Sequence, residues 1–139
     1  IKGFGKFKNR DCDLKQGLNV VYGSNEAGKS TLKTFMVSML YGIDSYRGRA
    51  AKKDAYHLYE PFDHGEYGGV MDVTKENEPY QIQRNFRKGS QSVHLIRKDT
   101  GKELSLDKNL LSLLNLLSRK YQEKILQFYQ SRFARNCDF

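Results

Sequence analysis

The chain has 139 residues, 38% of them hydrophobic, and a formal net charge of +8, which suits one domain or a large part of one. Regular apolar patterns argue against global disorder, and no run of about 18 apolar residues predicts a transmembrane helix. The first ten residues lack the apolar core of a secretion signal, and Cys12 and Cys137 have no metal-ligand spacing. We therefore expect a reduced, cytoplasmic protein without a membrane partner.

The first 22 residues predict strands. Residues 1–8 alternate around two phenylalanines and predict one strand, with turn residues at 9–11. A second strand is expected through residues 12–14, and a third, short and apolar, at residues 18–22. The third expected strand leads directly into a glycine-rich segment.

Two glycines interrupt the first expected strand. Gly3 and Gly5 weaken it and allow a ligand or another backbone segment to approach closely. Lys6 follows directly and is expected near the mouth of the glycine-rich segment, where the alternative is an ordinary solvated lysine.

Residues 23–30, GSNEAGKS, fit the phosphate-binding pattern G-x-x-x-x-G-K-[ST] at every specified position. Gly23 and Gly28 permit backbone conformations and close approaches that a Cβ atom would block. The loop amides and the start of the following helix can then face a phosphate. Lys29 supplies an ammonium group for the β- and γ-phosphates, and the Ser30 hydroxyl is placed to bind Mg²⁺.

The sequence therefore predicts a nucleotide site with Lys29 as its catalytic residue. The expected nucleotide-binding residues are Gly23, Ser24, Asn25, Glu26, Ala27, Gly28, Lys29, Ser30, Thr31 and Lys6. A glycine turn that binds nothing is the alternative, and the expected strand before the loop and helix after it argue against that alternative.

The apolar residues after the loop recur at helical spacing and lie on one face: Leu32, Phe35, Met36, Met39 and Leu40. Gly42 is a natural residue just past the end of this helix. Residues 43–56 are rich in charged and small residues and predict an exposed loop. Residues 59–65 are expected to be irregular but pinned down by burial of their aromatic side chains.

Residues 67–73, 80–86 and 92–98 alternate in the manner of three antiparallel strands. Turn residues separate them at 76–79 and 88–90, and a further turn is expected at 99–102. In the second of these strands, Tyr80, Ile82 and Phe86 are expected on one face. From residue 104 the period becomes helical, with Asp107 as N-cap of a leucine-rich helix and a second helix at 119–129.

Basic residues form two clusters, Arg47, Arg49, Lys52 and Lys53 in one and Arg84, Arg87, Lys88, Arg97 and Lys98 in the other. Both are compatible with nucleic-acid contact and with solvated loops and strand edges. The histidines, His57, His64 and His94, have no metal-ligand spacing and are expected at surface or turn positions.

Three passages resemble the N-terminal lobe of the ABC-type ATPase head of SMC and SbcC-like DNA-repair proteins, closest to the bacterial YhaN-like AAA-family ATPases. The first is IKGFGKFKN with GLNVVYGSNEAGKSTL, which has Asn25 in the family's usual place. The second is YGGVMDV followed by YQIQRNF, similar to family strands that end in Arg-x-aromatic. The third is the leucine-rich helix followed by RKYQEKILQFYQ, where the family has its Q-loop.

The resemblance extends to about Gln130 and implies an α/β P-loop NTPase fold, in which an antiparallel β-meander lies beside the P-loop strand and helix. It implies ATP and Mg²⁺ as ligands, with Gln130 as the Q-loop residue that joins Ser30 at the metal and Gln127 as its rival. It further implies a second ATPase head as a homodimeric partner, and DNA and a nuclease subunit in DNA repair or chromosome maintenance.

The family also needs a signature motif and an apolar strand ending in Asp-Glu, and neither pattern occurs here. We therefore expect residues 1–139 to form a single partial domain, one lobe of a head whose C-terminal lobe is absent, and which hydrolyses ATP only with that lobe and a second head. Two alternatives remain. One is a P-loop small-molecule or nucleotide kinase, which the consecutive antiparallel strands at 67–98 disfavour. The other is a basic nucleic-acid-binding module.

Overall fold

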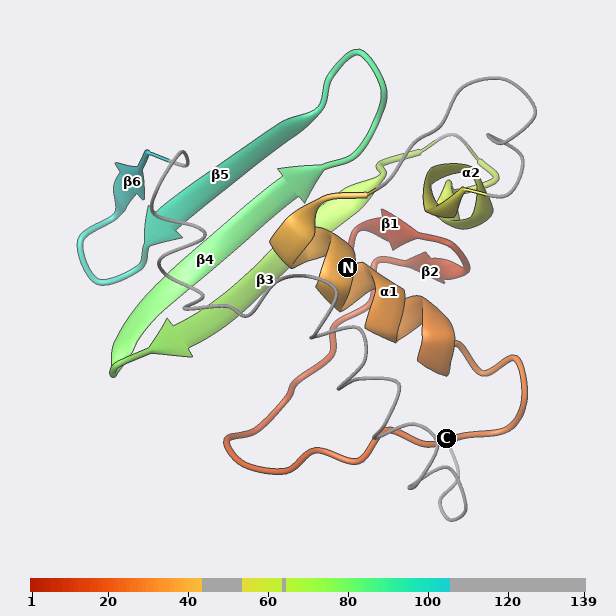
Figure 1. Cartoon of the computed structure of the whole chain (residues 1–139), viewed down its shortest axis with the longest axis horizontal. Helices are drawn as coiled ribbons and strands as arrows, with labels where there is room; N and C mark the ends of the chain where they lie inside the picture. Colours follow the sequence, from red (N-terminus) through yellow and green to blue (C-terminus); the bar gives the residue numbers. More distant parts are fainter. Residues whose placement is uncertain (44–53, 64, 106–139) are drawn as a thin grey trace.

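The computed structural model describes residues 1–43, 54–63 and 65–105 (Figure 1). Six antiparallel strands form one sheet in the order β2-β1-β3-β4-β5-β6. They are β1 (Gly3–Phe4), β2 (Phe7–Lys8), β3 (Gly68–Lys75), β4 (Glu78–Asn85), β5 (Ser92–Arg97) and β6 (Lys102–Leu104). The helices are α1 (Lys29–Tyr41) and α2 (Ala55–Tyr59). Figure 1 shows α1 lying against the sheet, with α2 beside the β1–β2 hairpin.

The main core lies between α1 and the sheet. Phe35 and Met39 of α1 are buried in one cluster with Ile82 of β4 and Leu95 of β5. Met36 and Leu40 pack at its margin, so the predicted helical face is confirmed. Burying one such side chain stabilises the fold by about 1.5–3 kcal/mol, and this burial fixes the position of α1 on the sheet.

The C-terminal end of α1 is held by two groups. Gly42 adopts a φ of 85° just past the last helical residue, and its N–H donates to the carbonyl oxygen of Ser38 at 2.8 Å, as the sequence predicts. Arg84 of β4 donates from Nε to the carbonyl oxygen of Met39 at 3.0 Å and from a terminal nitrogen to that of Leu40 at 3.5 Å. A guanidinium from the sheet thus satisfies carbonyl groups that the helix itself leaves without partners.

The predicted β-meander is confirmed as β3, β4 and β5, with Tyr80, Ile82 and Phe86 all buried. The turn between β3 and β4 is tighter than predicted because only Glu76 and Asn77 form it, both with positive φ, the geometry that suits a two-residue hairpin. Pro79, expected in the turn, lies in β4 opposite Thr74. β6 was not predicted; it begins at Lys102, the last residue of the turn expected at 99–102, and pairs with β5.

The single strand predicted for residues 1–8 is wrong: these residues form the β1–β2 hairpin. Gly5 has a φ of 55° and reverses the chain, which places Phe4 opposite Phe7. The expected close approach at Gly3 is confirmed, because a Cβ atom there would lie 1.9 Å from the carbonyl oxygen of Glu66. The hairpin is therefore bound tightly against the segment that leads into β3.

The strands predicted at residues 12–14 and 18–22 are also wrong, since neither segment has strand structure. Leu18 and Val20 are 80% and 50% exposed. A strand forms only when a neighbour completes its hydrogen-bond ladder, and the described sheet offers no strand beside these residues. The apolar character was identified correctly, but its pairing was not.

The exposed loop predicted at 43–56 is wrong at its end. Asp54 is buried and caps α2 by accepting the His57 N–H at 2.9 Å, and Tyr56 is 2% exposed. The Tyr56 ring packs edge-on against Tyr67, whose hydroxyl donates to the Tyr56 carbonyl oxygen at 2.8 Å. Burial raises the pKa of the Tyr67 phenol far above its ordinary range. This aromatic contact attaches α2 to the sheet.

The aromatic side chains of residues 59–65 differ in burial. Tyr59 stacks on Phe4 with 5.1 Å between ring centroids, as the expected pinning requires. Phe62, in contrast, is 97% exposed, so its predicted burial is wrong.

Cys12 is a free, exposed thiol. Within the described ranges, none of the helices has the length and apolarity needed to cross a membrane.

Residues 44–53, 64 and 106–139 lie outside the described part of the chain. The predictions that fall there are the first basic cluster, His64, the two C-terminal helices, and the glutamines Gln127 and Gln130.

Candidate nucleotide-binding loop

Residues 23–30 form a loop that ends where α1 begins. α1 starts at Lys29, so Gly28 is its N-cap residue, with a left-handed φ of 112°. The Ala27 N–H donates to the carbonyl oxygen of Ser24 at 3.2 Å and closes a turn, and Glu26 also has positive φ. Ser24, Asn25 and Glu26 are exposed. The loop is therefore a turn open to solvent at the start of a helix, as predicted, but the strand expected directly before it at residues 18–22 is absent.

The N-terminus of α1 is suited to an anion. Gly28 provides no side-chain cap, and the first turn contains no acidic residue. The first helix-type hydrogen bond runs from the Leu32 N–H to the Gly28 carbonyl oxygen at 2.8 Å. The amides of Lys29, Ser30 and Thr31 therefore have no partner within the helix, and the positive end of the helix dipole is not neutralised there.

Lys29 folds back over the loop. Its ammonium group donates to the carbonyl oxygen of Ser24 at 2.8 Å and also to that of Gly23. The cation is thus held by neutral carbonyl groups and not by a carboxylate. Because its charge is not paired with an anion in these contacts, a phosphate group at the loop would attract it more strongly than the carbonyls do.

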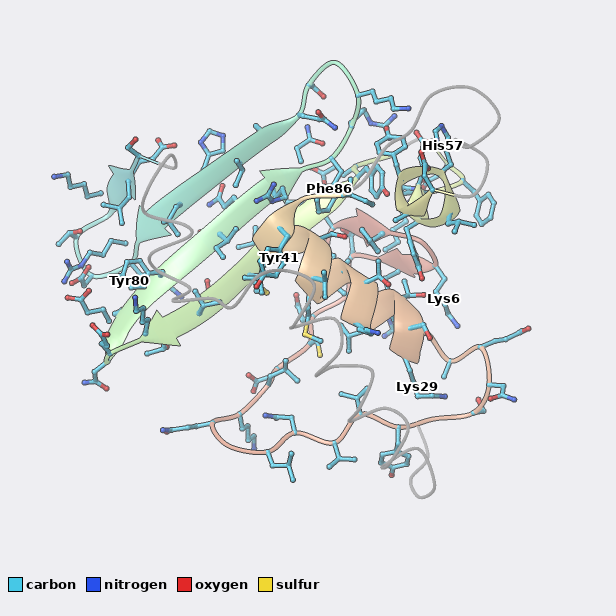
Figure 2. All side chains as sticks on the ribbon, viewed as in Figure 1. Lys6, Lys29, Tyr41, His57, Tyr80 and Phe86 are labelled. Carbon is cyan, nitrogen blue, oxygen red and sulfur yellow. The ribbon has the colours of Figure 1, made fainter. Side chains whose placement is uncertain are left out.

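Lys6 approaches the same loop from the hairpin, and its ammonium group donates to the carbonyl oxygen of Glu26. Figure 2 shows Lys6 and Lys29 near the same end of α1. The structure therefore places Lys6 at the mouth of the loop, as the sequence predicts. Two cationic side chains from separate parts of the chain meet at one turn.

The hairpin also packs against the loop through glycine. A Cβ atom on Gly28 would lie 2.6 Å from Cζ of Phe7, and one on Gly5 would lie 2.9 Å from Cγ2 of Thr31. Only glycine at both positions allows this packing, since each also has positive φ. The role of Phe7 was not predicted, because it depends on the hairpin that reverses the chain at Gly5 and places Phe7 opposite Phe4.

The described residues fit ATP and Mg²⁺ in part. The uncapped helix start, Lys29 and Lys6 fit a polyphosphate, and Ser30 presents an exposed hydroxyl at the first turn of α1. The described ranges hold no group of three or more His, Cys, Asp or Glu residues able to bind a metal. Mg²⁺ commonly takes few protein ligands and several from phosphate and water, so a serine hydroxyl suits it.

The second basic cluster is occupied by contacts inside the molecule. Arg97 binds Glu78 at 2.6 Å and Asp99 at 2.9 Å, and Lys98 binds Asp72 at 2.6 Å. Lys88 lies over the Tyr56 ring, Arg87 donates to the Gly65 carbonyl oxygen, and Arg84 caps α1. These contacts favour the structural interpretation of the cluster over nucleic-acid contact.

Arg84 is the described residue whose role was most clearly missed from the sequence. Burial lowers the pKa of its guanidinium, which is half-buried under α1. Its position in the strand indicated this role, because alternate residues of a strand face the same side, and residue 84 therefore faces the core with residues 80, 82 and 86.

The histidines take structural positions. Nδ1 of His57 lies 2.7 Å from Oδ1 of Asp54, and Nδ1 of His94 lies 2.6 Å from Oε1 of Glu103 across β5 and β6. Both are on the surface, as predicted.

Comparison with known proteins gives two matches. A family model described as an AAA domain matches residues 1–136. The uncharacterized protein YhaN of Bacillus subtilis (strain 168) is 43% identical over 74 residues, which are 52% of this chain and 7% of YhaN. The matched part is thus a small fraction of that relative. No solved structure matches.

Proposed function

The chain belongs to the AAA domain family, which confirms its resemblance to YhaN-like AAA-family ATPases, and from that premise we propose that residues 23–31 and Lys6 bind ATP with Mg²⁺. The observation that carries the proposal is the convergence of Lys29, Lys6 and the uncapped start of α1 on one exposed loop. Three sources of positive potential at a single turn favour a polyphosphate over an uncharged ligand.

In the proposed complex the phosphates take the place of the loop carbonyls as partners of Lys29. Moving the ammonium group from the Ser24 and Gly23 carbonyl oxygens to phosphate oxygens replaces neutral acceptors by charged ones, which make stronger hydrogen bonds. Lys29 then stabilises the charge of the transferred phosphoryl group, and Ser30 holds Mg²⁺ together with Gln130. Lys6 adds a second cation from outside the motif.

We propose further that this chain is the N-terminal lobe of an ABC-type, SMC/SbcC-like ATPase head. The apolar segment at 18–22 supports this, because exposed Leu18 and Val20 suit a strand whose neighbours come from another lobe. Hydrolysis then requires the C-terminal lobe and a second head, which supply the general base and enclose the nucleotide. DNA repair or chromosome maintenance, with DNA and a nuclease subunit as partners, is the corresponding role.

The test is nucleotide binding by the 139-residue chain, measured by isothermal titration calorimetry with ATP and Mg²⁺. Lys29→Ala should weaken ATP and tripolyphosphate alike, by about tenfold or more, because it removes a hydrogen bond to phosphate worth about 1.5–3 kcal/mol. Lys15→Ala, an exposed lysine before the loop, is the matched control and should bind as wild type does. A Lys29→Ala chain that binds ATP as tightly as wild type would refute the proposal.

A further inference from the structure

The turn of the β1–β2 hairpin is packed against both helices. Gly5 and Lys6 form this turn, because they join the end of β1 to the start of β2. A Cβ atom on Gly5 would lie 2.9 Å from Cγ2 of Thr31 on α1 and 3.2 Å from Cδ1 of Tyr59 on α2. The turn therefore has no free space in which to move toward either side chain.

Tyr59, the last residue of α2, contacts the turn through its backbone and its ring. Its carbonyl oxygen accepts the Gly5 N–H at 2.6 Å. Its ring stacks on Phe4 of β1, with 5.1 Å between centroids and 18° between planes. Thr34 of α1 donates from Oγ1 to the Tyr59 hydroxyl oxygen at 3.3 Å. One residue thus connects the hairpin to the helix that begins at the candidate loop.

α2 is itself attached to the sheet region through Tyr56, which is 2% exposed. The Tyr67 hydroxyl donates to the Tyr56 carbonyl oxygen at 2.8 Å, just before β3. The Lys88 N–H, just after β4, donates to the Tyr56 hydroxyl oxygen at 3.2 Å. Because α2 is held in this way, Tyr59 is placed on a fixed element. A packed, hydrogen-bonded support of this kind is what holds a functional side chain in a precise position.

Lys6 depends on such support. Its side chain is exposed, and its ammonium group donates to the carbonyl oxygen of Glu26 in the loop. A lysine side chain is flexible and carries a compact charge, so the position of its backbone decides which groups the charge can reach. Because Lys6 directly follows Gly5, the contacts that fix the turn also fix the starting point of this side chain. A displaced turn would move the ammonium group away from the loop.

We propose that Tyr59 is a positioning residue for Lys6. Its ring holds the hairpin turn beside α1 and thereby keeps the Lys6 ammonium group at the candidate loop. The inference rests on the proposed nucleotide-binding function and adds to it a residue outside the loop that acts on the phosphates only through Lys6.

The test is a double-mutant cycle on the affinity of the 139-residue chain for tripolyphosphate, measured by isothermal titration calorimetry. Lys6→Ala should weaken binding by wild type about tenfold, because it removes a charged hydrogen bond to phosphate. In a Tyr59→Leu chain the same substitution should weaken binding less than about twofold, because Lys6 is no longer held at the loop. A residue with a merely structural role would lower stability and leave the effect of Lys6→Ala unchanged. Equal effects in the two backgrounds would therefore overturn the inference.

Two further backgrounds separate positioning from general destabilisation. Tyr59→Phe keeps the ring and loses only the hydroxyl, so Lys6→Ala should retain its full effect there, and loss of that effect would overturn the role of the ring. Tyr80→Leu is the matched control, because it also removes a buried tyrosine, and Figure 2 shows Tyr80 far from Lys6. It should lower stability and retain the Lys6 effect. If Tyr80→Leu abolished that effect as Tyr59→Leu does, general destabilisation would be the cause and the inference would be wrong.

Circular dichroism establishes that each variant is folded. If Tyr59→Leu lacks the native spectrum, Tyr59→Met, which preserves more of the apolar volume without the flat ring, takes its place with the same expected result. Failure of the proposed function looks different, because wild type would then bind neither ATP nor tripolyphosphate, or Lys29→Ala would bind both as tightly as wild type. Normal binding by Lys6→Ala, together with weakened binding by Lys29→Ala, would overturn this inference alone.

Discussion

Nε of Arg84 in β4 donates to the carbonyl oxygen of Met39 in the last turn of α1 at 3.0 Å. The same helix begins at the loop of residues 23–30, so this contact fixes the end of α1 that lies away from the candidate site. Burial lowers the pKa of the Arg84 guanidinium. Arginine is nevertheless effectively always protonated, so the hydrogen bonds of Arg84 are charge-assisted.

Replacing Arg84 by methionine should lower the free energy of unfolding by about 2 kcal/mol, because it removes a hydrogen bond from a charged donor and leaves helix carbonyls without a partner. Urea denaturation, monitored by circular dichroism, measures this change in the free energy of unfolding. Lys102→Met on edge strand β6, where the side chain is exposed, should alter stability by less than about 0.5 kcal/mol. Equal stabilities of the two variants would show that Arg84 does not hold α1.

The sequence predicted those parts of the fold that depend on local pattern. The apolar stripe of α1 and the alternation in β4 both predict the buried residues correctly, because the spacing of residues within one segment decides which of them share a face. The strand predicted at residues 18–22 was wrong because an apolar run has the same composition whether or not a partner strand is present. The predicted burial of Phe62 was wrong because its aromatic character does not reveal whether another part of the chain covers it, and in the described residues it is exposed.

The residues of the candidate loop could be predicted from the motif, but the contacts that the hairpin makes with the loop could not. The pattern at 23–30 specified Lys29 and Gly28, but the support from Phe7 depends on a hairpin that reverses at Gly5. That reversal brings together residues twenty positions apart, Lys6 and Glu26, which no local pattern encodes.

Gly28→Ala should be destabilising for two reasons. A residue with a Cβ atom is strained at a φ of 112°, and that atom would lie 2.6 Å from the Phe7 ring. Gly89→Ala is a control for the first reason alone, because its φ is 84° and nothing lies within 4 Å of its Cβ position. We expect Gly89→Ala to cost about 1 kcal/mol and Gly28→Ala about 2–4 kcal/mol once overpacking is added, measured by thermal or urea unfolding. If both variants lose the same stability, the hairpin does not press against the loop.

Asp72 predicts a pH dependence of stability. Its hydrogen bond from Lys98 lowers the pKa of the Asp72 carboxyl below the ordinary value. A lowered pKa in the folded state means that the pair stabilises the protein above the ordinary pKa of about 3.9 and that this contribution is lost as the pH falls through the lowered value. Asp72→Asn should therefore be slightly less stable than wild type at pH 7, by under about 1 kcal/mol for this exposed pair.

The difference between wild type and Asp72→Asn should shrink as the pH falls below about 4, and it should also shrink in about 1 M salt because the pair is exposed to solvent. Urea midpoints measured at pH 7 and at pH 3 provide the comparison. A gap that widens toward low pH would contradict the assigned direction.

The proposed contact with DNA should depend on the first basic cluster and not on the second. Arg97 and Lys98 already bind carboxylates, so Arg97→Gln should leave DNA affinity and its salt dependence nearly unchanged. Lys52→Gln with Lys53→Gln should weaken duplex DNA binding and reduce the slope of log affinity against log salt by about 0.9 for each phosphate that is no longer neutralised. Fluorescence anisotropy with labelled duplex DNA between roughly 50 and 200 mM salt, where electrostatic binding weakens steeply, measures both quantities. Affinity that does not change with salt, or a larger effect from Arg97→Gln than from the lysine pair, would exclude this interaction.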